Sequence, residues 1–404
     1  MAEFQILKLG VIFLIIITLL GFKRPLYQAM LAGIVATALL FGIRPQDCLR
    51  LIFRVCSNWG AMSILVSLYL ITFLQRMLEK RGQIKLAQED LNGLFHNRRV
   101  NATGASLFIG LLPSAAAMIL CGEIVKDSSD GYLDPKEQAF VASWFRHIPE
   151  STLPTYSSVL LMSGLTGVPL PQFMLGMVVP LVVLFLLGYL PYLRKLPKDP
   201  GTPHSLYKFR DLQNLIRHLW TLLAILLLIL VFKLSVTTAV VGVILLGVAV
   251  YRFHWRELKP MFASAFEHKL LLNTLLVLVL KEFMGKTGVL QALPSALSVL
   301  PIPMYLVFAL MFFVGTVISG SNGIIALGAP MAFAAIPGSG MPLMVLLMCM
   351  CHAASQLSPT HVCLLIASDY FGITLGDLVR KTLPVALVFC ALMVGYYQML
   401  LMLF

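Results

Sequence analysis

Long apolar runs separated by short polar stretches make up most of the chain. Runs such as LGVIFLIIITLLG at 9–21 and LWTLLAILLLILVF at 219–232 lie within segments that approach the ~20 residues a helix needs to cross a bilayer. The pattern predicts ten membrane-spanning helices, near 6–21, 25–42, 58–78, 137–166, 170–193, 213–234, 237–252, 264–284, 340–366 and 383–403. The predicted fold class is therefore an all-α polytopic membrane protein.

Two further apolar stretches, about 101–125 and 303–334, are interrupted by GLLPSAAA and ISGSNGIIALGAP. Glycine, serine, asparagine and proline favour a turn over a continuous helix. We predict that both stretches form re-entrant hairpins, which enter and leave the membrane on the same side.

Composition and charge narrow the class further. Hydrophobic residues make up 59% of the 404 residues and charged residues 12%, against roughly a quarter charged in soluble domains. The net charge of +12 lies mainly in short loops, so it indicates topology and not a nucleic-acid partner. The positive-inside rule places the loops at 23–24, 76–99 and 194–217 in the cytoplasm and both termini outside.

One segment occurs twice. HIPESTLPTYSSVLLMSGLTGVPL at 147–170 aligns without a gap to HAASQLSPTHVCLLIASDYFGITL at 352–375, with seven identities where roughly two are expected by chance. The same offset brings the two hairpins into register. We predict two repeats, 1–194 and 213–404, joined by a cytoplasmic linker at 195–212. Each repeat has five spans, and an odd number inverts the second repeat relative to the first.

The repeated segment carries a proline inside a helical span, Pro154 in one half and Pro359 in the other. Proline removes a backbone donor and disrupts the helix before it, and polar partners must satisfy the freed carbonyls in a membrane. We predict that the two breaks and the two hairpin tips enclose one polar chamber. The predicted substrate- or ion-binding residues are Ser114, Ala115, Thr152, Thr155, Ser319, Gly320, Ser321, Asn322, Gly323, Ser358 and Thr360.

The chemistry of these groups leaves the ligand open. Hydroxyl and carbonyl oxygens suit a hard cation such as sodium, and amides at a half-helix N-terminus suit an anion. The alternative is that glycine and serine only pack helices together.

Ionisable residues at membrane depth are functional candidates, because burying a charge there is costly. His147, Glu150 and His361 are the predicted proton-coupling residues. The alternative is that Arg146 and Glu150 form an ion pair that only neutralises its own two charges and has no role in coupling. CMCH at 349–352 has no partner pair of ligands elsewhere, so we predict no metal, and no cofactor beyond sodium or a proton as coupling ion.

Amphipathic stretches precede the third span of each half, DCLRLIFRVCSNW at 47–59 and YRFHWRELKPMF at 251–262. Such helices can lie in the membrane plane. They are predicted to be arms that join a fixed part to a moving one.

The segment WFRHIPESTLPTYSSVLLMSGLTGVPL, together with LSPTHVCLLIASDYFG and the LP and SGS of the hairpins, resembles a family of prokaryotic permease-like proteins of unknown function. That family is grouped in the ion transporter superfamily with gluconate, citrate and arsenite permeases and divalent anion:sodium symporters. The resemblance covers about residues 20–400. It implies a homodimer in the cytoplasmic (inner) membrane, built on a scaffold, with elevator movement of a domain that holds both hairpins.

The better-known symporters of that superfamily carry Ser-Asn-Thr at both tips. Here Ser321-Asn322-Gly323 keeps the first two residues, and Ser114-Ala115-Ala116 keeps only the serine. Proton coupling is therefore an alternative to sodium coupling.

The predicted function is secondary active transport of a small, anionic solute, with membrane lipid as the surrounding partner. A channel, or a translocase of lipids or their head groups, would use the same cavity. Ser358 and His361 are the nearest candidate nucleophile and base, but no G-x-S-x-G or H-E-x-x-H motif accompanies them, so no enzyme is predicted.

Overall fold

The structure is a computed structural model that describes residues 2–83, 85–87, 89–90, 97–111, 117–199, 207–294, 301–359 and 361–403. All regular secondary structure in these ranges is helical, and they contain no strand. The predicted all-α class is therefore confirmed.

The helices follow the apolar pattern of the sequence. The first half contains α1 (Ala2–Gly21), α2 (Leu26–Leu40), α3 (Pro45–Ser57), α4 (Trp59–Lys80), α6 (Arg98–Ile109), α7 (Ala117–Ser129), α8 (Pro135–His147), the 3₁₀ turn η1 (Ile148–Ser151), α9 (Ser157–Thr166), α10 (Leu170–Gly176) and α11 (Val178–Tyr189). After the turn η2 (Leu193–Lys195), the second half contains α12 (Lys208–Leu230), α13 (Val236–Val250), α14 (Trp255–Ser264), α15 (His268–Thr287), η3 (Val289–Ala292), α17 (Met304–Ser319), α18 (Ser321–Ala335), α19 (Gly340–Ser355), α20 (Val362–Tyr370) and α21 (Leu375–Leu403).

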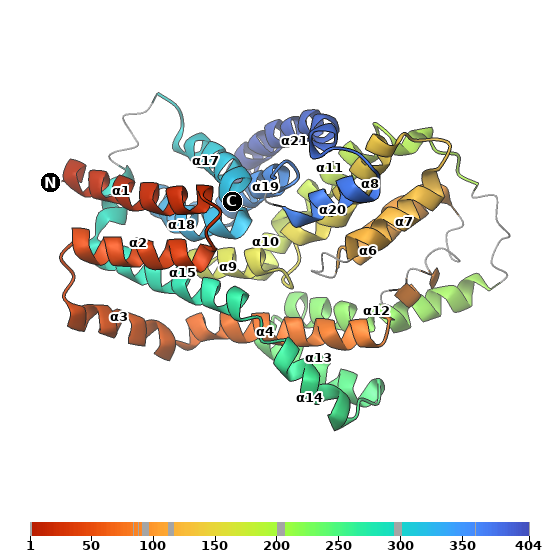
Figure 1. Ribbon diagram of the computed structural model, residues 1–404, viewed down its shortest axis with the longest axis horizontal. Coiled ribbons are helices and arrows are strands. Elements are labelled where there is room, and N and C mark those ends of the chain that lie inside the picture. Colours follow the sequence, from red (N-terminus) through yellow and green to blue (C-terminus); the bar gives the residue numbers. More distant parts are fainter. Residues whose placement is uncertain are drawn as a thin grey trace.

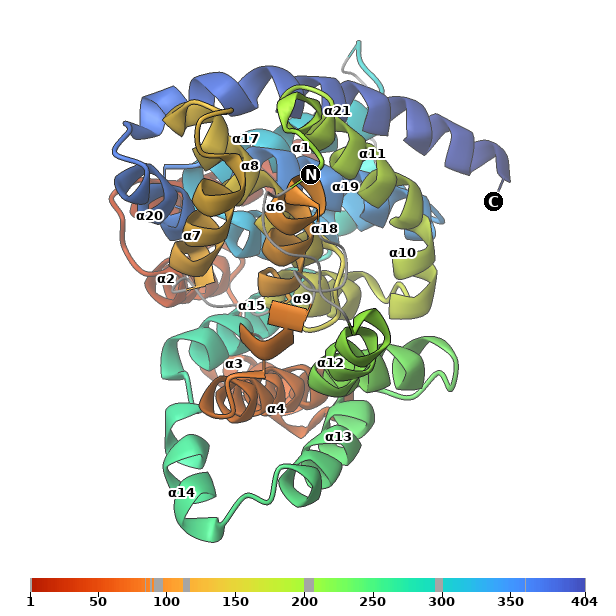
Figure 2. The same ribbon diagram turned by 90° about the vertical axis from the view of Figure 1, so that its right-hand side faces the viewer.

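The helices form two groups (Figures 1 and 2). Helices α3, α4, α12, α13 and α14 lie together on one side, and the pairs α6–α7 and α17–α18 lie on the other with α8, α19, α20 and α21. Helices α9 and α15 run between the groups. A direct hydrogen bond of 2.7 Å between Ser67 Oγ and Thr237 Oγ1 ties α4 to α13 within the first group.

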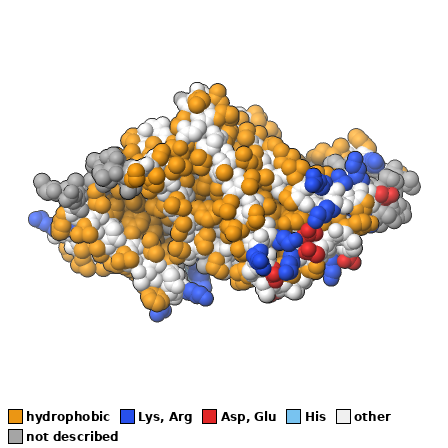
Figure 3. Space-filling model, turned by 90° about the horizontal axis from the view of Figure 1, so that it is seen from above, with side chains coloured by type: hydrophobic (Ala, Val, Ile, Leu, Met, Phe, Trp, Pro, Cys, Tyr) orange, Lys and Arg blue, Asp and Glu red, His pale blue; other side chains and the backbone are white. Residues whose placement is uncertain are grey.

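Four helices are long and apolar enough to cross a membrane: Phe4–Gly21, Trp59–Lys80, Lys208–Leu230 and Leu375–Leu403. Two bent pairs, α9 with α10 and α14 with α15, raise the number to six if each pair is one span. Six shorter apolar helices accompany them in the described ranges. Hydrophobic side chains cover most of the face in Figure 3, and charged side chains gather mainly towards one end. The chain is thus a multi-pass membrane protein, and the count of ten spans stays a prediction.

The stretch predicted as one span at 170–193 is divided at Met177 into α10 and α11, and its role as a single span stays a prediction. Pro180 has no N–H with which to bond the carbonyl of Gly176, one turn earlier. The hydroxyl of Tyr396 on α21 donates to that carbonyl instead, at 3.0 Å. The proline therefore ends α10 and gives the last helix an attachment point.

Helix α21 starts at Leu375, earlier than the 383 predicted from hydropathy. Thr374 and Asp377 stabilise the early start, because the Asp377 N–H donates to Thr374 Oγ1 at 3.1 Å and the Thr374 N–H donates to Asp377 Oδ2 at 3.3 Å. Such reciprocal capping satisfies donors that a helix start leaves unpaired. Because its first turns contain polar residues, the hydropathy pattern predicted the start of this helix too late in the chain.

The two amphipathic stretches form α3 and α14. Helix α14 docks on α4 through Arg81, whose guanidinium donates to both carboxylate oxygens of Glu257 at 2.9 and 3.1 Å and lies over the ring of Phe253. Phe73 on α4 and Phe262 on α14 also stack, with ring centres 4.5 Å apart. Aromatic and bidentate contacts together fix α14 more firmly than a single surface ion pair would.

Candidate functional site

The span predicted at 137–166 is interrupted between α8 and α9. Pro149 and Pro154 both lie in the interruption, and neither offers a backbone donor. The carbonyl of Pro149 accepts from the N–H groups of Thr152 and Leu153 at 3.2 and 3.0 Å, which closes a short turn instead of a continuing helix. We call residues 148–156 the first break.

The span predicted at 340–366 is interrupted between α19, which ends at Ser355, and α20, which begins at Val362. We call residues 356–361 the second break. Its proline is exposed, whereas Pro154 in the first break is buried. Pro154 and Pro359 therefore occupy equivalent positions in the two repeated segments but lie in different surroundings.

The last turn of α8, which leads into the first break, contacts the second break directly. Ser143 on α8 donates from Oγ to Oε1 of Gln356 at 3.2 Å. His147, at the end of α8, faces His361, and their Nε2 atoms lie 2.8 Å apart. Segments more than two hundred residues apart in the chain thus form one buried polar contact.

The orientation of His147 fixes its tautomer. Its Nδ1 lies 2.6 Å from the carbonyl oxygen of Ser143, an acceptor, so Nδ1 carries the proton. When His147 is neutral, Nε2 is then an acceptor, and His361 donates from its own Nε2. In this state a single N–H···N hydrogen bond joins the two imidazoles.

A charged pair lies beside the histidines. The guanidinium of Arg146 approaches the carboxylate of Glu150 to 3.6 Å, and His147 Nε2 lies 3.8 Å from the same carboxylate oxygen. The side chains of Arg146 and His147 are 2% and 1% exposed, whereas Glu150 is 27% exposed. Glu150 therefore lies between the buried side chains of Arg146 and His147 and a region that is more accessible to solvent.

Cys363 completes a group that has the spacing of metal ligands. One ligand atom each from His147, His361 and Cys363 lies within 4.8 Å of the others. However, the two Nε2 atoms are at hydrogen-bond distance, closer than the ~3.3 Å that separates two nitrogens on one tetrahedral zinc. The charge of Arg146 nearby also opposes a dication. The arrangement fits a hydrogen bond between the two imidazoles better than a metal ion.

The turn of the second hairpin meets both breaks. Gly320 joins α17 to α18 at a φ of +76°, a conformation that favours glycine. Asn322 on α18 donates from Nδ2 to Ser157 Oγ at the start of α9, at 3.2 Å. Ser358 in the second break donates from Oγ to the carbonyl of Val317 on α17, at 2.9 Å. The second hairpin turn thus contacts the second break and the start of α9, directly after the first break. The single chamber that includes both hairpin tips stays a prediction.

Two small cavities flank the hairpin turn, each of about 10 Å³, roughly the size of one water molecule or ion. One is lined mainly by polar groups: Glu150, Ser151, Ser158, Ser321, His352 and Ser355, with Met348 and Cys351. The other has Ser157, Asn322, Asn273 and Thr274 among its lining residues. Carboxylate and hydroxyl oxygens around a one-ion cavity suit a hard cation or a bound water.

Several buried polar atoms around the breaks have no hydrogen-bond partner within the described ranges. They are Thr152 Oγ1, Thr155 Oγ1, Asn322 Oδ1, His352 Nε2 and Gln356 Nε2. Buried polar atoms are nearly always paired in native proteins, so such a concentration points to a bound solute, ion or water.

The first hairpin contacts the first break through Gly110, at the end of α6. The hydroxyl of Tyr156 donates to the carbonyl of Gly110. A Cβ on Gly110 would lie 2.1 Å from the carbonyl oxygen of Arg146, so only glycine allows this approach. The predicted tip residues Ser114 and Ala115 lie outside the described ranges, as does Thr360.

Replacing Tyr156 with phenylalanine should lower the free energy of unfolding by about 1–2 kcal/mol, because the buried Gly110 carbonyl loses its donor. Thermal unfolding of the purified protein measures the change. Tyr132→Phe, at a largely exposed position, is the matched control and should change little. If the two variants unfold at the same temperature, the hydrogen bond from Tyr156 to Gly110 does not stabilise the hairpin.

Sequence reasoning did not single out Ser143, Ser157 or Tyr156, and it named Gly110 only as the counterpart of Gly315 in the other hairpin. Ser143 lies one helical turn before His147, so the i, i+4 spacing on α8 could have suggested it. The contact between Gly110 and Tyr156 joins separate segments and has no local signal.

The architecture defined by these elements is a helical membrane protein with interrupted helices and a helical hairpin around buried polar groups. Its fold is similar to the crystal structure of the YdaH transporter from Alcanivorax borkumensis, with a TM-score of 0.54 and 12% identity over 89% of each chain. At this identity the likeness shows the fold alone.

The chain belongs to the family of proteins of unknown function DUF401, whose model matches residues 6–400. No curated protein matches the chain. The predicted membership of a family of unknown function is confirmed, and its place in the ion transporter superfamily stays a prediction.

Proposed function

We propose that this protein is a secondary active transporter that moves a small organic anion across the cytoplasmic membrane, coupled to sodium or protons. The observation that carries the proposal is the junction of the two breaks with the turn of the second hairpin. Five of the buried polar atoms that have no hydrogen-bond partner in the described part of the chain lie around this junction. Interrupted helices at mid-membrane are the usual binding sites of secondary transporters.

The anion would bind at the start of α18. The first N–H groups of a helix have no partner within the helix, and the helix dipole favours negative charge at that end. Ser321 and Asn322 form the first turn of α18, and Ser157 starts α9 opposite them. Two helix starts therefore converge on one place, where a carboxylate could accept from both.

Two coupling ions have support in the site. The cavity lined by Glu150 and the serine hydroxyls offers oxygen ligands for sodium. The contact of His147 with His361, beside Glu150, offers a proton site with a more exposed carboxylate as its entrance. We favour the proton, because Glu150 lies beside two hydrogen-bonded imidazoles, and all three groups can bind a proton.

Alternating access would follow from the arrangement of the halves. The order of elements in the second half repeats that of the first, with an amphipathic helix, a long helix, a helical hairpin and an interrupted helix in succession. We propose that the halves are inverted repeats and that the hairpins move with α8, α9, α19 and α20 against α4, α12 and α13, as a homodimer.

Uptake into proteoliposomes tests the function. Candidate carboxylate anions should accumulate only while a proton or sodium gradient is present. Asn322→Ala should lower uptake about tenfold, since one buried hydrogen bond and one ligand-facing amide are lost. Ser57→Ala, at an exposed position on α3, is the control. Uptake that equilibrates without any gradient would indicate a channel instead.

A further inference from the structure

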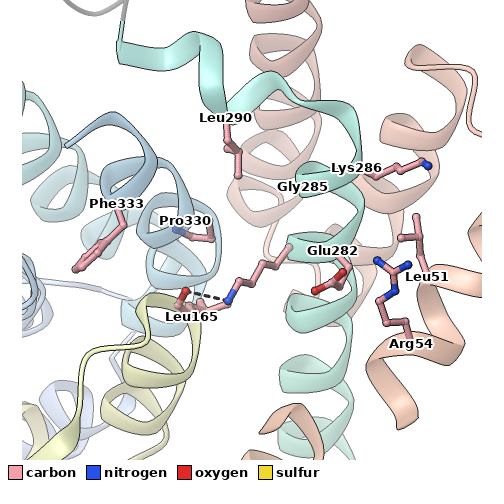
Figure 4. Close-up of a pocket in the computed structure, with 10 residues that line it drawn as sticks. Leu51, Arg54, Leu165, Glu282, Gly285, Lys286, Leu290, Pro330 and Phe333 are labelled. Carbon is pink, nitrogen blue, oxygen red and sulfur yellow. Dashed lines mark hydrogen bonds between the residues drawn. The ribbon is translucent and has the colours of Figure 1, made fainter. Parts of the chain in front are cut away.

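A separate pair of cavities lies on the surface of α15, away from the junction of the breaks. The larger has a volume of about 350 Å³ and the adjoining one about 270 Å³. They share Arg54, Lys281 and Glu282. The larger cavity extends from α3 on one side of α15 to α18 and the end of α9 on the other (Figure 4).

The lining of the larger cavity combines positive charge with an apolar wall. Arg54, Lys281 and Lys286 contribute three positive charges against the one negative charge of Glu282. The apolar wall consists of Leu51, Leu165, Leu290, Pro330 and Phe333. A ligand complementary to this lining has an anionic group at one end and hydrocarbon at the other.

The positive charges are not neutralised by close ion pairs. Arg54, Lys281 and Lys286 have no carboxylate within 4 Å in the described part of the chain. Lys281 instead donates from Nζ to the carbonyls of Leu165 and Gly164 at 2.9 and 3.4 Å, at the C-terminal end of α9. These contacts hold the ammonium group at the cavity and leave its charge unpaired.

Helix α3, which forms one side of the cavity, has the character of a helix that contacts lipid. It buries Leu51 and Val55 towards the protein and exposes Leu49 and Phe53, which are 69% and 73% accessible. Basic residues accompany the exposed apolar ones. Exposed apolar and basic side chains on one short amphipathic helix are typical of contact with anionic membrane surfaces.

We propose that this cavity binds an anionic phospholipid, with its phosphate between Arg54, Lys281 and Lys286 and an acyl chain along Pro330 and Phe333. A phosphate forms charge-assisted hydrogen bonds with several basic side chains, and an acyl chain is removed from water along an apolar wall. The bound lipid would bridge α3 and α15 to α9 and α18 and stabilise their packing. This site is distinct from the proposed transport site and does not depend on transport.

Native mass spectrometry of the delipidated full chain tests the proposal directly. Dioleoylphosphatidylglycerol should bind about tenfold more tightly than dioleoylphosphatidylcholine, and it alone should raise the melting temperature. The double variant Lys281→Gln/Lys286→Gln should lose this preference. Arg256→Gln/Lys259→Gln removes the same charge from exposed positions on α14 and should keep it.

Three outcomes would overturn the proposal. The two lipids could bind equally, or the double variant could keep the preference of the unchanged protein. Inorganic phosphate could also stabilise the protein as well as phosphatidylglycerol does, which would indicate a site for free anions. If the double variant does not fold, Arg54→Gln serves in its place, because Arg54 is exposed on α3 and contacts little else.

Discussion

Replacing Gly110 with alanine should destabilise the protein by about 3 kcal/mol or more, the largest effect we expect from adding a single methyl group. The new Cβ would lie 2.1 Å from the carbonyl oxygen of Arg146 and 3.2 Å from that of Leu107. Both obstacles are backbone atoms, which cannot turn aside as a flexible side chain can. Helix α6 would have to move away from α8, and Tyr156 would lose its acceptor on Gly110.

The matched control is Gly242→Ala in α13. No atom lies within 4 Å of the added Cβ there, and alanine favours a helix over glycine by about 1 kcal/mol. Thermal unfolding in the same detergent compares the two variants. We expect Gly110→Ala to unfold at a much lower temperature and Gly242→Ala to match or exceed the unchanged protein. A Gly110→Ala protein of normal stability would contradict the close packing of α6 on α8.

Replacing Glu150 with glutamine should abolish proton-driven uptake, with a fall of about a hundredfold for a group that carries the coupled proton. Glutamine keeps the shape of the side chain but removes the charge that faces Arg146 at 3.6 Å and His147 at 3.8 Å. Loss of that charge should also lower the free energy of unfolding by about 2 kcal/mol, because Arg146 stays buried.

The pH dependence of uptake separates a coupling role from a structural one. In the unchanged protein, uptake should rise as the outside pH falls, and the dependence should disappear in Glu150→Gln. Glu123→Gln, an exposed carboxylate on α7, is the control and should keep the normal profile. If Glu150→Gln loses stability but retains proton-driven uptake, the Arg146–Glu150 pair is structural only, which is the alternative that the sequence left open.

Local chemistry explains which features could be predicted from the sequence. Pro154 and Pro359 lack a donor wherever they lie, so interruptions near them follow from the residue type alone. The glycine- and serine-rich turn around Gly320 follows from backbone conformation in the same way. Division of the span at 170–193 was missed, although Pro180 gave the same local signal inside an apolar run.

Individual side-chain contacts between distant segments could not be predicted, although the meeting of the two breaks with the hairpin tips was expected. The bond between His147 and His361 depends on how α8 meets the second break, and nothing in either segment specifies the other. The approach of Gly110 to Arg146 likewise appears only in the folded chain. Such contacts arise from packing of whole helices, which hydrophobic periodicity does not determine.

Accessibility of residue 321 from the two sides of the membrane tests alternating access at the hairpin turn most directly. Ser321→Cys would be placed in a chain whose incompletely buried thiols, Cys48, Cys56 and Cys390, are replaced by serine. A membrane-impermeant maleimide should label position 321 from either side of oriented vesicles, and a transported anion with its coupling ion should slow the labelling. Labelling from one side only, whatever ligand or gradient is supplied, would contradict a site that opens to both sides in turn.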